Sequence, residues 1–168
     1  MIGTFLQRPV VVATVGATVV MGLGGALTKL GPWYEQLRKP SWQPPGWVFP
    51  TVWTSIAALT VWSVSHGWPL LSAAGLSGTA IALFAVNGVL NVAWSGLFFS
   101  LQRPDWSLIE VVPLWASVLS LVVLMASVSP FSALLLLPYL LWVGIAAVLN
   151  RAIVRLNQPF GAEARPAV

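Results

Sequence analysis

The amino-acid sequence predicts an all-α protein, an integral membrane bundle of five transmembrane helices that forms a single domain over residues 1–168. Of its 168 residues, 58% are hydrophobic and 7% are charged, and the mean hydropathy is +0.87. Because a soluble domain carries about 25% charged residues, this composition argues strongly against a soluble globular fold. Five apolar runs are long enough for a membrane helix, which needs roughly 20 residues.

The apolar runs are joined by short segments, except between the first two. In order, the expected spans are residues 9–27, 47–65, 70–99, 107–128 and 131–154. The third span is long enough to tilt or to include an interfacial turn. Arg8 before the first run could mark a signal peptide, but the run is long for one and no soluble domain follows it, so we expect a span.

Basic residues are distributed unevenly between the two sides of a five-span protein. The side with the C-terminus and the first and third loops would carry Lys29, Arg38, Lys39, Arg103, Arg151, Arg155 and Arg165. The opposite side would carry only Arg8. Lys and Arg are enriched in cytoplasmic loops, so in an inner membrane the first loop and the C-terminus would face the cytoplasm. The same residues account for a pI near 10.4 without a nucleic-acid partner.

Several kinds of chemistry lack the residues that they need. The chain has no cysteine and one histidine, His66, which excludes disulfides, thiolate chemistry and a His-rich metal site. We therefore expect no metal ion. The sequence also lacks a Ser/His/Asp set and a phosphate-binding loop. We interpret His66 as an interfacial histidine at the end of the second span rather than as a haem ligand.

The third span has two different faces. At about 100° per residue, one narrow stripe carries two amides and two aromatic rings: Asn87, Asn91, Trp94 and Phe98. Polar side chains at mid-membrane usually face the bundle interior, so this stripe either lines a cavity or hydrogen-bonds neighbouring helices. The opposite stripe is a row of small residues suited to close helix approach, inside the bundle or in a homodimer: Ala74, Gly78, Ala82 and Ala85.

Two further spans carry apolar and aromatic stripes. On the second span, the stripe consists of Phe49, Trp53, Ile56, Ala57 and Thr60, and Trp62 points the other way, toward lipid. On the fifth span, it consists of Tyr139, Trp142, Ala146 and Leu149. Such walls with a few polar groups describe a small-molecule pocket. They also describe an ordinary bundle core, and residue spacing alone leaves both interpretations open.

Residues 39–53, KPSWQPPGWVFPTVW, are rich in proline and tryptophan. The first three prolines keep the end of the first loop out of helix. We expect Trp42 and Trp47 to hold this segment over the mouth of the bundle as a lid. Near the start of the fourth span, Glu110 is expected to pair with Arg103 or a base of the first loop, or else to face a water-filled vestibule.

Three groups of residues together resemble the TspO/MBR family, the tryptophan-rich sensory proteins whose animal members are translocator proteins or peripheral benzodiazepine receptors. The groups are WY at 33–34 with KPSWQPPGWVF at 39–49 and VW at 52–53, LNVAW at 90–94 with FF at 98–99, and LPYLLW at 137–142 with Ala146 and LN at 149–150. The resemblance covers about residues 10–155, and the chain looks most similar to bacterial members.

The resemblance implies a five-helix bundle, usually homodimeric, with a cavity under the first loop that binds porphyrins and drug-like molecules. It implies no obligatory cofactor; protoporphyrin IX or haem would be a ligand. Matched position by position, the ligand-binding residues would be Trp42, Phe49, Trp53, Asn87, Asn91, Trp94, Phe98, Trp142 and Ala146. Glu110 stands where many relatives have aspartate.

Three functions follow as hypotheses from this resemblance. The leading one is a tetrapyrrole-binding sensor, carrier or scavenger in a bacterial cell membrane that regulates tetrapyrrole metabolism or a stress response. The first alternative is an enzyme that degrades protoporphyrin IX in light, for which Trp33 and Trp142 would be the catalytic residues. The second is a porphyrin transporter, which the absence of an obvious inverted repeat disfavours.

Overall fold

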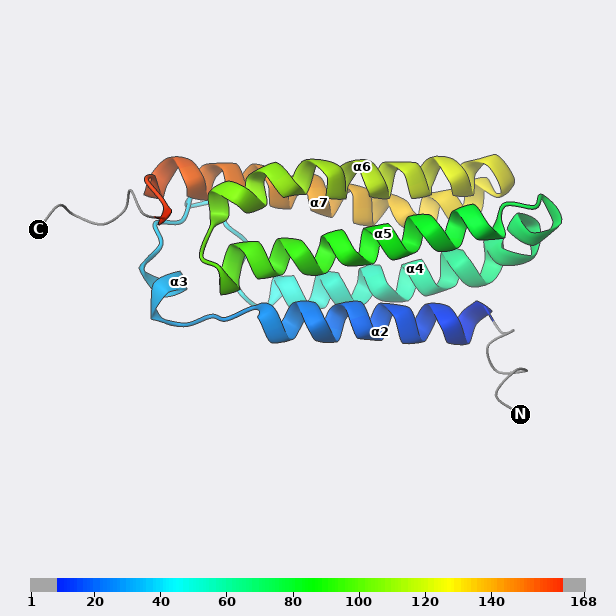
Figure 1. Cartoon of the computed structure of the whole chain (residues 1–168), viewed down its shortest axis with the longest axis horizontal. Coiled ribbons are helices and arrows are strands. Elements are labelled where there is room, and N and C mark those ends of the chain that lie inside the picture. The colour runs from blue at the N-terminus through cyan, green and yellow to red at the C-terminus, as the bar shows by residue number, and fades with distance from the viewer. Residues whose placement is uncertain (1–8, 162–168) are drawn as a thin grey trace, which may run out of the picture.

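The computed structural model describes residues 9–161, and five long helices lie side by side in one bundle (Figure 1). They are α2 (Pro9–Leu27), α4 (Val48–Ala73), α5 (Ser77–Ser95) with its continuation η1 (Gly96–Ser100), α6 (Pro104–Val128) and α7 (Pro130–Asn157). The short helix α3 (Pro32–Gln36) lies in the first loop. All five long helices are long and apolar enough to cross a membrane, which confirms the predicted fold class. Arg8 and Arg165, used above to predict the topology, lie outside the described residues.

The connection between the second and third spans differs from the expected one. Helix α4 continues to Ala73 instead of ending near residue 65, and α5 begins at Ser77 instead of near residue 70. Pro69 lies inside α4, where a transmembrane helix tolerates proline. The helix is instead terminated by Gly75, which lies two residues after Ala73 and whose φ of 72° is left-handed. The Leu76 N–H bonds the Leu71 carbonyl at 2.8 Å, as in a glycine-terminated Schellman motif.

Helix α5 ends in one turn of π-helix, η1, which the sequence did not predict. The Leu101 N–H reaches the Gly96 carbonyl at 2.9 Å, five residues back. The Ser100 hydroxyl donates to the Leu27 carbonyl at 3.0 Å. Because the last carbonyls of a helix have no partner within it, this bond satisfies an end group of α2 and joins α2 to η1.

The five helices close into a ring in the order α2, α4, α7, α6, α5 and back to α2. The half of the core near the α4–α5 turn is mainly aliphatic, with Leu71, Leu121, Met125 and Leu136 almost fully buried. Gly67 permits close approach there, because a Cβ at this position would lie 3.0 Å from the Ser132 hydroxyl oxygen. The opposite half of the core is richer in aromatic residues, with Tyr139, Trp142 and Phe98 buried among aliphatic side chains.

The first loop, residues 28–47, lies at the same end of the bundle as the end of α7 (Figure 1). Asn157 at the end of α7 holds it there through two hydrogen bonds of 2.8 Å. The side-chain oxygen of Asn157 accepts from the Arg38 N–H, and its amide nitrogen donates to the Arg38 carbonyl. The aromatic half of the core therefore lies beneath a loop that is anchored to the last helix.

Candidate functional site

Two aromatic pairs join α4 and α7 in the half of the bundle beneath the first loop. The Phe49 and Trp142 rings meet edge to face with centroids 5.7 Å apart, and the Trp53 and Tyr139 rings do so at 5.9 Å. Trp142 is 9% exposed, whereas Phe49 and Trp53 are partly buried and pack against the same core cluster. The structure thus brings together three predicted site residues from two spans. Ala146, one turn after Trp142, is half-buried.

A second aromatic group extends from α5 through η1 to the first loop. Trp94 stacks on Phe98 with ring centroids 5.3 Å apart, and Trp33 from α3 meets Phe98 edge-on at 6.2 Å. Tyr34 contacts Phe99 at 5.5 Å. Trp94 and Phe49 pack against both core clusters of this half of the bundle. The predicted aromatic residues therefore form one continuous surface inside the bundle, with the exception of Trp42.

The loop tryptophans lie differently from the aromatic residues of the helices. Trp42 is 51% exposed and Trp47 is 69% exposed, whereas Tyr34 is half-buried under the loop. Lys39 Nζ lies 4.2 Å above the Tyr34 ring, and Gln43 donates a 3.5 Å hydrogen bond to the Tyr34 hydroxyl. Burial raises the pKa of Tyr34, and the bond from Gln43 partly opposes this rise. Lys39 and Gln43, from the later part of the first loop, therefore pack over Tyr34 on α3 of the same loop.

Both asparagines of the third span are bonded to Tyr139, and sequence reasoning missed this role of its hydroxyl. Asn91 donates to the Tyr139 hydroxyl at 2.9 Å, and that hydroxyl donates to the Asn87 side-chain oxygen at 3.0 Å. Asn87 also donates to the Ser117 hydroxyl at 2.9 Å. Asn87 is 6% exposed, and Asn91 is partly buried. The network ties α5 to α6 and α7 and places an amide and a phenol beside the aromatic surface.

Glu110 does not make the pairing with Arg103 that we expected. Arg103 instead forms an ion pair with Asp105, two residues away, and its guanidinium lies 4.2 Å above the Trp106 ring. Both carboxylate oxygens of Glu110 are buried, and neither has a hydrogen-bond partner among the described residues. Arg103 and Asp105 are only two residues apart, so their ion pair requires less ordering of the chain than a pair between Arg103 and Glu110 would.

The row of small residues lies on the outside of the bundle. Its members Ala74, Gly78, Ala82 and Ala85 are all exposed. Ala74 caps the end of α4, and the other three lie on α5. This row therefore does not serve packing within the bundle.

His66 lies on α4 at the opposite end from the first loop. Its Nδ1 is 3.1 Å from the Ser132 hydroxyl oxygen and 3.4 Å from that of Ser129. The ring also contacts Phe131 edge-on, with centroids 5.0 Å apart. Ser129 is at the same time the N-cap of α7. The His66 side chain is thus part of a polar group at the start of α7, away from the aromatic surface.

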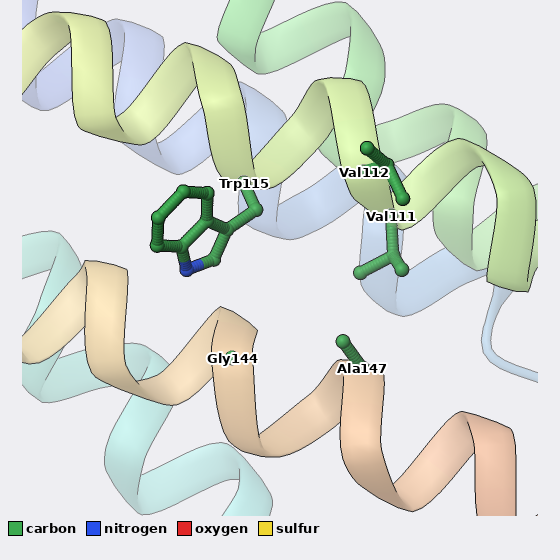
Figure 2. A pocket seen from close by; sticks show the side chains of 5 residues that line it. All are labelled: Val111, Val112, Trp115, Gly144 and Ala147. Atoms are coloured by element: carbon green, nitrogen blue, oxygen red, sulfur yellow. The ribbon is translucent and has the colours of Figure 1, made fainter.

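A groove of about 260 Å³ lies between α6 and α7 and was not expected from the sequence. Figure 2 shows its lining, which consists of Val111, Val112, Trp115, Gly144 and Ala147. A Cβ at Gly144 would lie 3.6 Å from the Trp115 indole nitrogen. None of the predicted site residues lines this groove. Within residues 9–161, His, Asp and Glu side chains form no group of three that could hold a metal ion.

Comparison with known proteins agrees with these features. A model of the TspO/MBR family matches residues 10–156. The chain is 37% identical over 141 residues to Protein CrtK of Rhodobacter capsulatus, covering 84% of this chain and 88% of the relative. It is 37% identical over 153 residues to the Translocator protein of Sus scrofa, with coverages of 86% and 89%.

A further relative is the Tryptophan-rich sensory protein of Cereibacter sphaeroides, which is 35% identical over 133 residues, with coverages of 79% and 82%. The family match spans all five long helices and the first loop between α2 and α4. The resemblance noted in the sequence motifs is confirmed, and this chain belongs to the TspO/MBR family.

Proposed function

We propose that this membrane protein binds a tetrapyrrole such as protoporphyrin IX or haem and acts as a sensor, carrier or scavenger of it. The observation that carries this proposal is the continuous aromatic surface beneath the first loop, formed by Phe49, Trp53, Trp94, Phe98 and Trp142. A flat macrocycle gains from stacking on aromatic faces and from leaving water. The names of two relatives, a sensory protein and a translocator protein, are consistent with this role.

The acidic groups of a porphyrin need donors or cations, and the first loop supplies them. Lys39 and Arg38 lie on this loop, where Arg38 is held by Asn157. Asn91 adds an amide at the level of Tyr139. We place the macrocycle against the aromatic surface, with its propionates directed toward the loop and Asn91 beside its ring.

Titration of the purified protein with protoporphyrin IX, read by quenching of tryptophan emission and by the porphyrin absorption band, tests this proposal. Trp53→Ala should weaken binding at least fivefold, because it removes a ring from the aromatic surface. Trp62→Ala is the matched control, since Trp62 is 56% exposed and contacts Phe131 outside this surface. Equal affinities of Trp53→Ala and the wild type would remove Trp53 from the site.

A second candidate is light-dependent degradation of the bound porphyrin. Trp33 and Trp142 favour it, because both reach the aromatic surface, Trp33 through Phe98 and Trp142 through Phe49. Dioxygen activated by the excited porphyrin would add both of its atoms across a double bond of the macrocycle and open the ring, while the adjacent indoles act as redox partners or radical quenchers. Product spectra of the wild type and Trp142→Phe under illumination, with free porphyrin as control, separate the two candidates. Equal degradation rates would leave the protein as a binder only.

Porphyrin transport is a third candidate, ranked below binding. Porphyrin flux into proteoliposomes, compared between protein-containing and empty vesicles, is the measurement that would raise it above the other two.

We propose that the protein lies in a bacterial cell membrane with its first loop and C-terminus in the cytoplasm. We also propose that it forms a homodimer, whose two copies meet at the outward row of Ala74, Gly78, Ala82 and Ala85. A C-terminal fusion to alkaline phosphatase should be inactive in cells, and strong phosphatase activity would reverse the orientation. Ala82→Trp should convert the dimer to a monomer in size-exclusion chromatography with light scattering. The control, Leu134→Trp, enlarges an exposed residue of α7, a helix that does not neighbour α5 in the bundle.

A further inference from the structure

Two unpartnered polar groups are buried next to the aromatic surface. Both carboxylate oxygens of Glu110 and the indole nitrogen of Trp94 are out of contact with solvent and have no hydrogen-bond partner among the described residues. Burying a carboxylate without a partner is expensive, and an unpaired buried N–H is also costly. A cost of this kind is retained where the groups serve a ligand, since a ligand can supply the missing partners.

The packing of α5 and α6 brings these two groups to the same level. The two helices are antiparallel neighbours, and the bond from Asn87 to Ser117 fixes their register. Trp94 lies seven residues after Asn87, and Glu110 lies seven residues before Ser117. Seven residues correspond to a rise of about 10.5 Å and return to within about 20° of the same face. Trp94 and Glu110 therefore occupy facing positions two turns from the Asn87–Ser117 bond.

Glu110 also faces the aromatic surface. It lies one turn before Leu114, which is buried in the same core cluster as Tyr139 and Trp142, and Tyr139 packs on Trp53. The nearest basic residue along the chain, Arg103, is paired with Asp105. Because the Glu110 oxygens and the Trp94 N–H are not bonded to each other, each is left to take a partner from a molecule lying against the aromatic rings.

We propose that Glu110 is the recognition residue for an N–H group on a flat aromatic ligand. The ligand N–H donates to a Glu110 oxygen, while the ligand ring lies on the aromatic surface. This inference rests on the proposed function only in placing a ligand at that surface, and it adds a requirement for an N–H donor.

Carbazole and fluorene test this requirement, because the two tricyclic molecules differ only in an N–H group that replaces CH₂. Each is equilibrated with full-length protein in nanodiscs and with empty nanodiscs, and the free ligand is measured, so that partition into lipid is subtracted. The wild type should bind carbazole about tenfold more tightly than fluorene, which is the size expected for one additional hydrogen bond.

Substitutions at Glu110 then assign the preference to this residue. Glu110→Leu should bind both molecules equally, and Glu110→Gln, which keeps one acceptor oxygen, should retain a two- to threefold preference. Glu35→Leu is the matched control, since Glu35 is exposed on α3, and it should keep the full preference. Circular dichroism verifies that each variant is folded. If Glu110→Leu does not fold, the test rests on Glu110→Gln, whose preference for carbazole should be smaller than that of the wild type.

Two results would overturn the inference: equal binding of carbazole and fluorene by the wild type, or a preference that survives in Glu110→Leu. Protoporphyrin titration of the same samples keeps this outcome separate from the proposed function. A wild type that prefers carbazole but ignores porphyrin would refute tetrapyrrole binding alone. A wild type that binds porphyrin without distinguishing carbazole from fluorene would refute the role of Glu110 alone.

Discussion

The side-chain amide of Asn157 forms a two-bond pair with the backbone N–H and C=O of Arg38. Its amide oxygen accepts from the Arg38 N–H and its amide nitrogen donates to the Arg38 carbonyl, both at 2.8 Å, across 119 residues of sequence. The same nitrogen also donates to the Ile153 carbonyl in α7. A single side chain thus connects the middle of the first loop to the last turn of the bundle.

Replacing Asn157 should loosen the first loop more than the bundle. Asn157→Ala removes both bonds to Arg38, each worth about 0.5–1.5 kcal/mol, and should speed amide hydrogen exchange across residues 28–47. Asn157→Asp keeps the acceptor but not the donor and should have an intermediate effect. Hydrogen-exchange mass spectrometry in detergent measures this, with Gln158→Ala as the neighbouring control. Unchanged exchange in Asn157→Ala would mean that other contacts hold the loop.

Removing the Tyr139 hydroxyl should destabilise the bundle. Tyr139→Phe leaves the Asn87 oxygen and an Asn91 N–H without their partner, which costs about 1–3 kcal/mol for a buried group. Thermal unfolding followed by circular dichroism should show a lower midpoint. The same change at Tyr34, whose hydroxyl accepts one long bond of 3.5 Å, should have a much smaller effect. A larger loss for Tyr34→Phe than for Tyr139→Phe would contradict this assignment.

A methyl group at Gly67 should be poorly tolerated. The added Cβ would lie 3.0 Å from the Ser132 hydroxyl oxygen and 3.1 Å from the Met125 sulfur, and overpacking of this kind typically costs about 1–3 kcal/mol. Gly22→Ala, on the exposed side of α2 with nothing within 4 Å of its Cβ, should be neutral or stabilising because alanine favours helix. Gly67→Ala should therefore lower the midpoint of thermal unfolding, whereas Gly22→Ala should leave it unchanged or raise it.

The turn between α4 and α5 should depend on glycine at position 75. Its φ of 72° lies in the left-handed region, where a Cβ costs about 1–2 kcal/mol. Gly75→Ala should lower the unfolding midpoint, and Gly75→Asn should lower it less, because asparagine adopts this conformation more readily. Since no atom lies within 4 Å of a Cβ there, the difference would report the backbone alone. Equal midpoints for wild type and Gly75→Ala would exclude strain at this turn.

The sequence predicted the helices and their faces because both depend on local pattern. Hydrophobic length identified five spans, and angular spacing placed Asn87 and Ala82 on opposite faces of the third span; in the structure Asn87 is buried and Ala82 is exposed. The second span was expected to end near residue 65, but α4 continues past Pro69 to Ala73. In a membrane helix, proline can be accommodated, whereas a left-handed glycine ends the helix.

The partners of polar side chains could not be predicted, because they depend on how one helix is shifted along another. Periodicity places Asn87 and Tyr139 on inward faces but says nothing of their relative height. The same limit explains why the sequence did not show that Glu110 lacks a partner. It also explains why the groove beside Trp115 was not expected; there, Gly144 on α7 stands opposite the Trp115 ring. The π-turn η1 left no signal in periodicity, since its five residues are too few to define a period.

The π-turn also sets consecutive aromatic residues of the first loop against consecutive aromatic residues of the bundle. Trp33 contacts Phe98, and Tyr34 contacts Phe99. Because the two pairs are adjacent in both segments, inserting or deleting one residue in the first loop before Trp33, or in the helix before Phe98, would misalign both pairs at once. The contacts of Trp33 and Tyr34 therefore depend on the length of the connection after Leu27, and not only on the chemical identity of its residues.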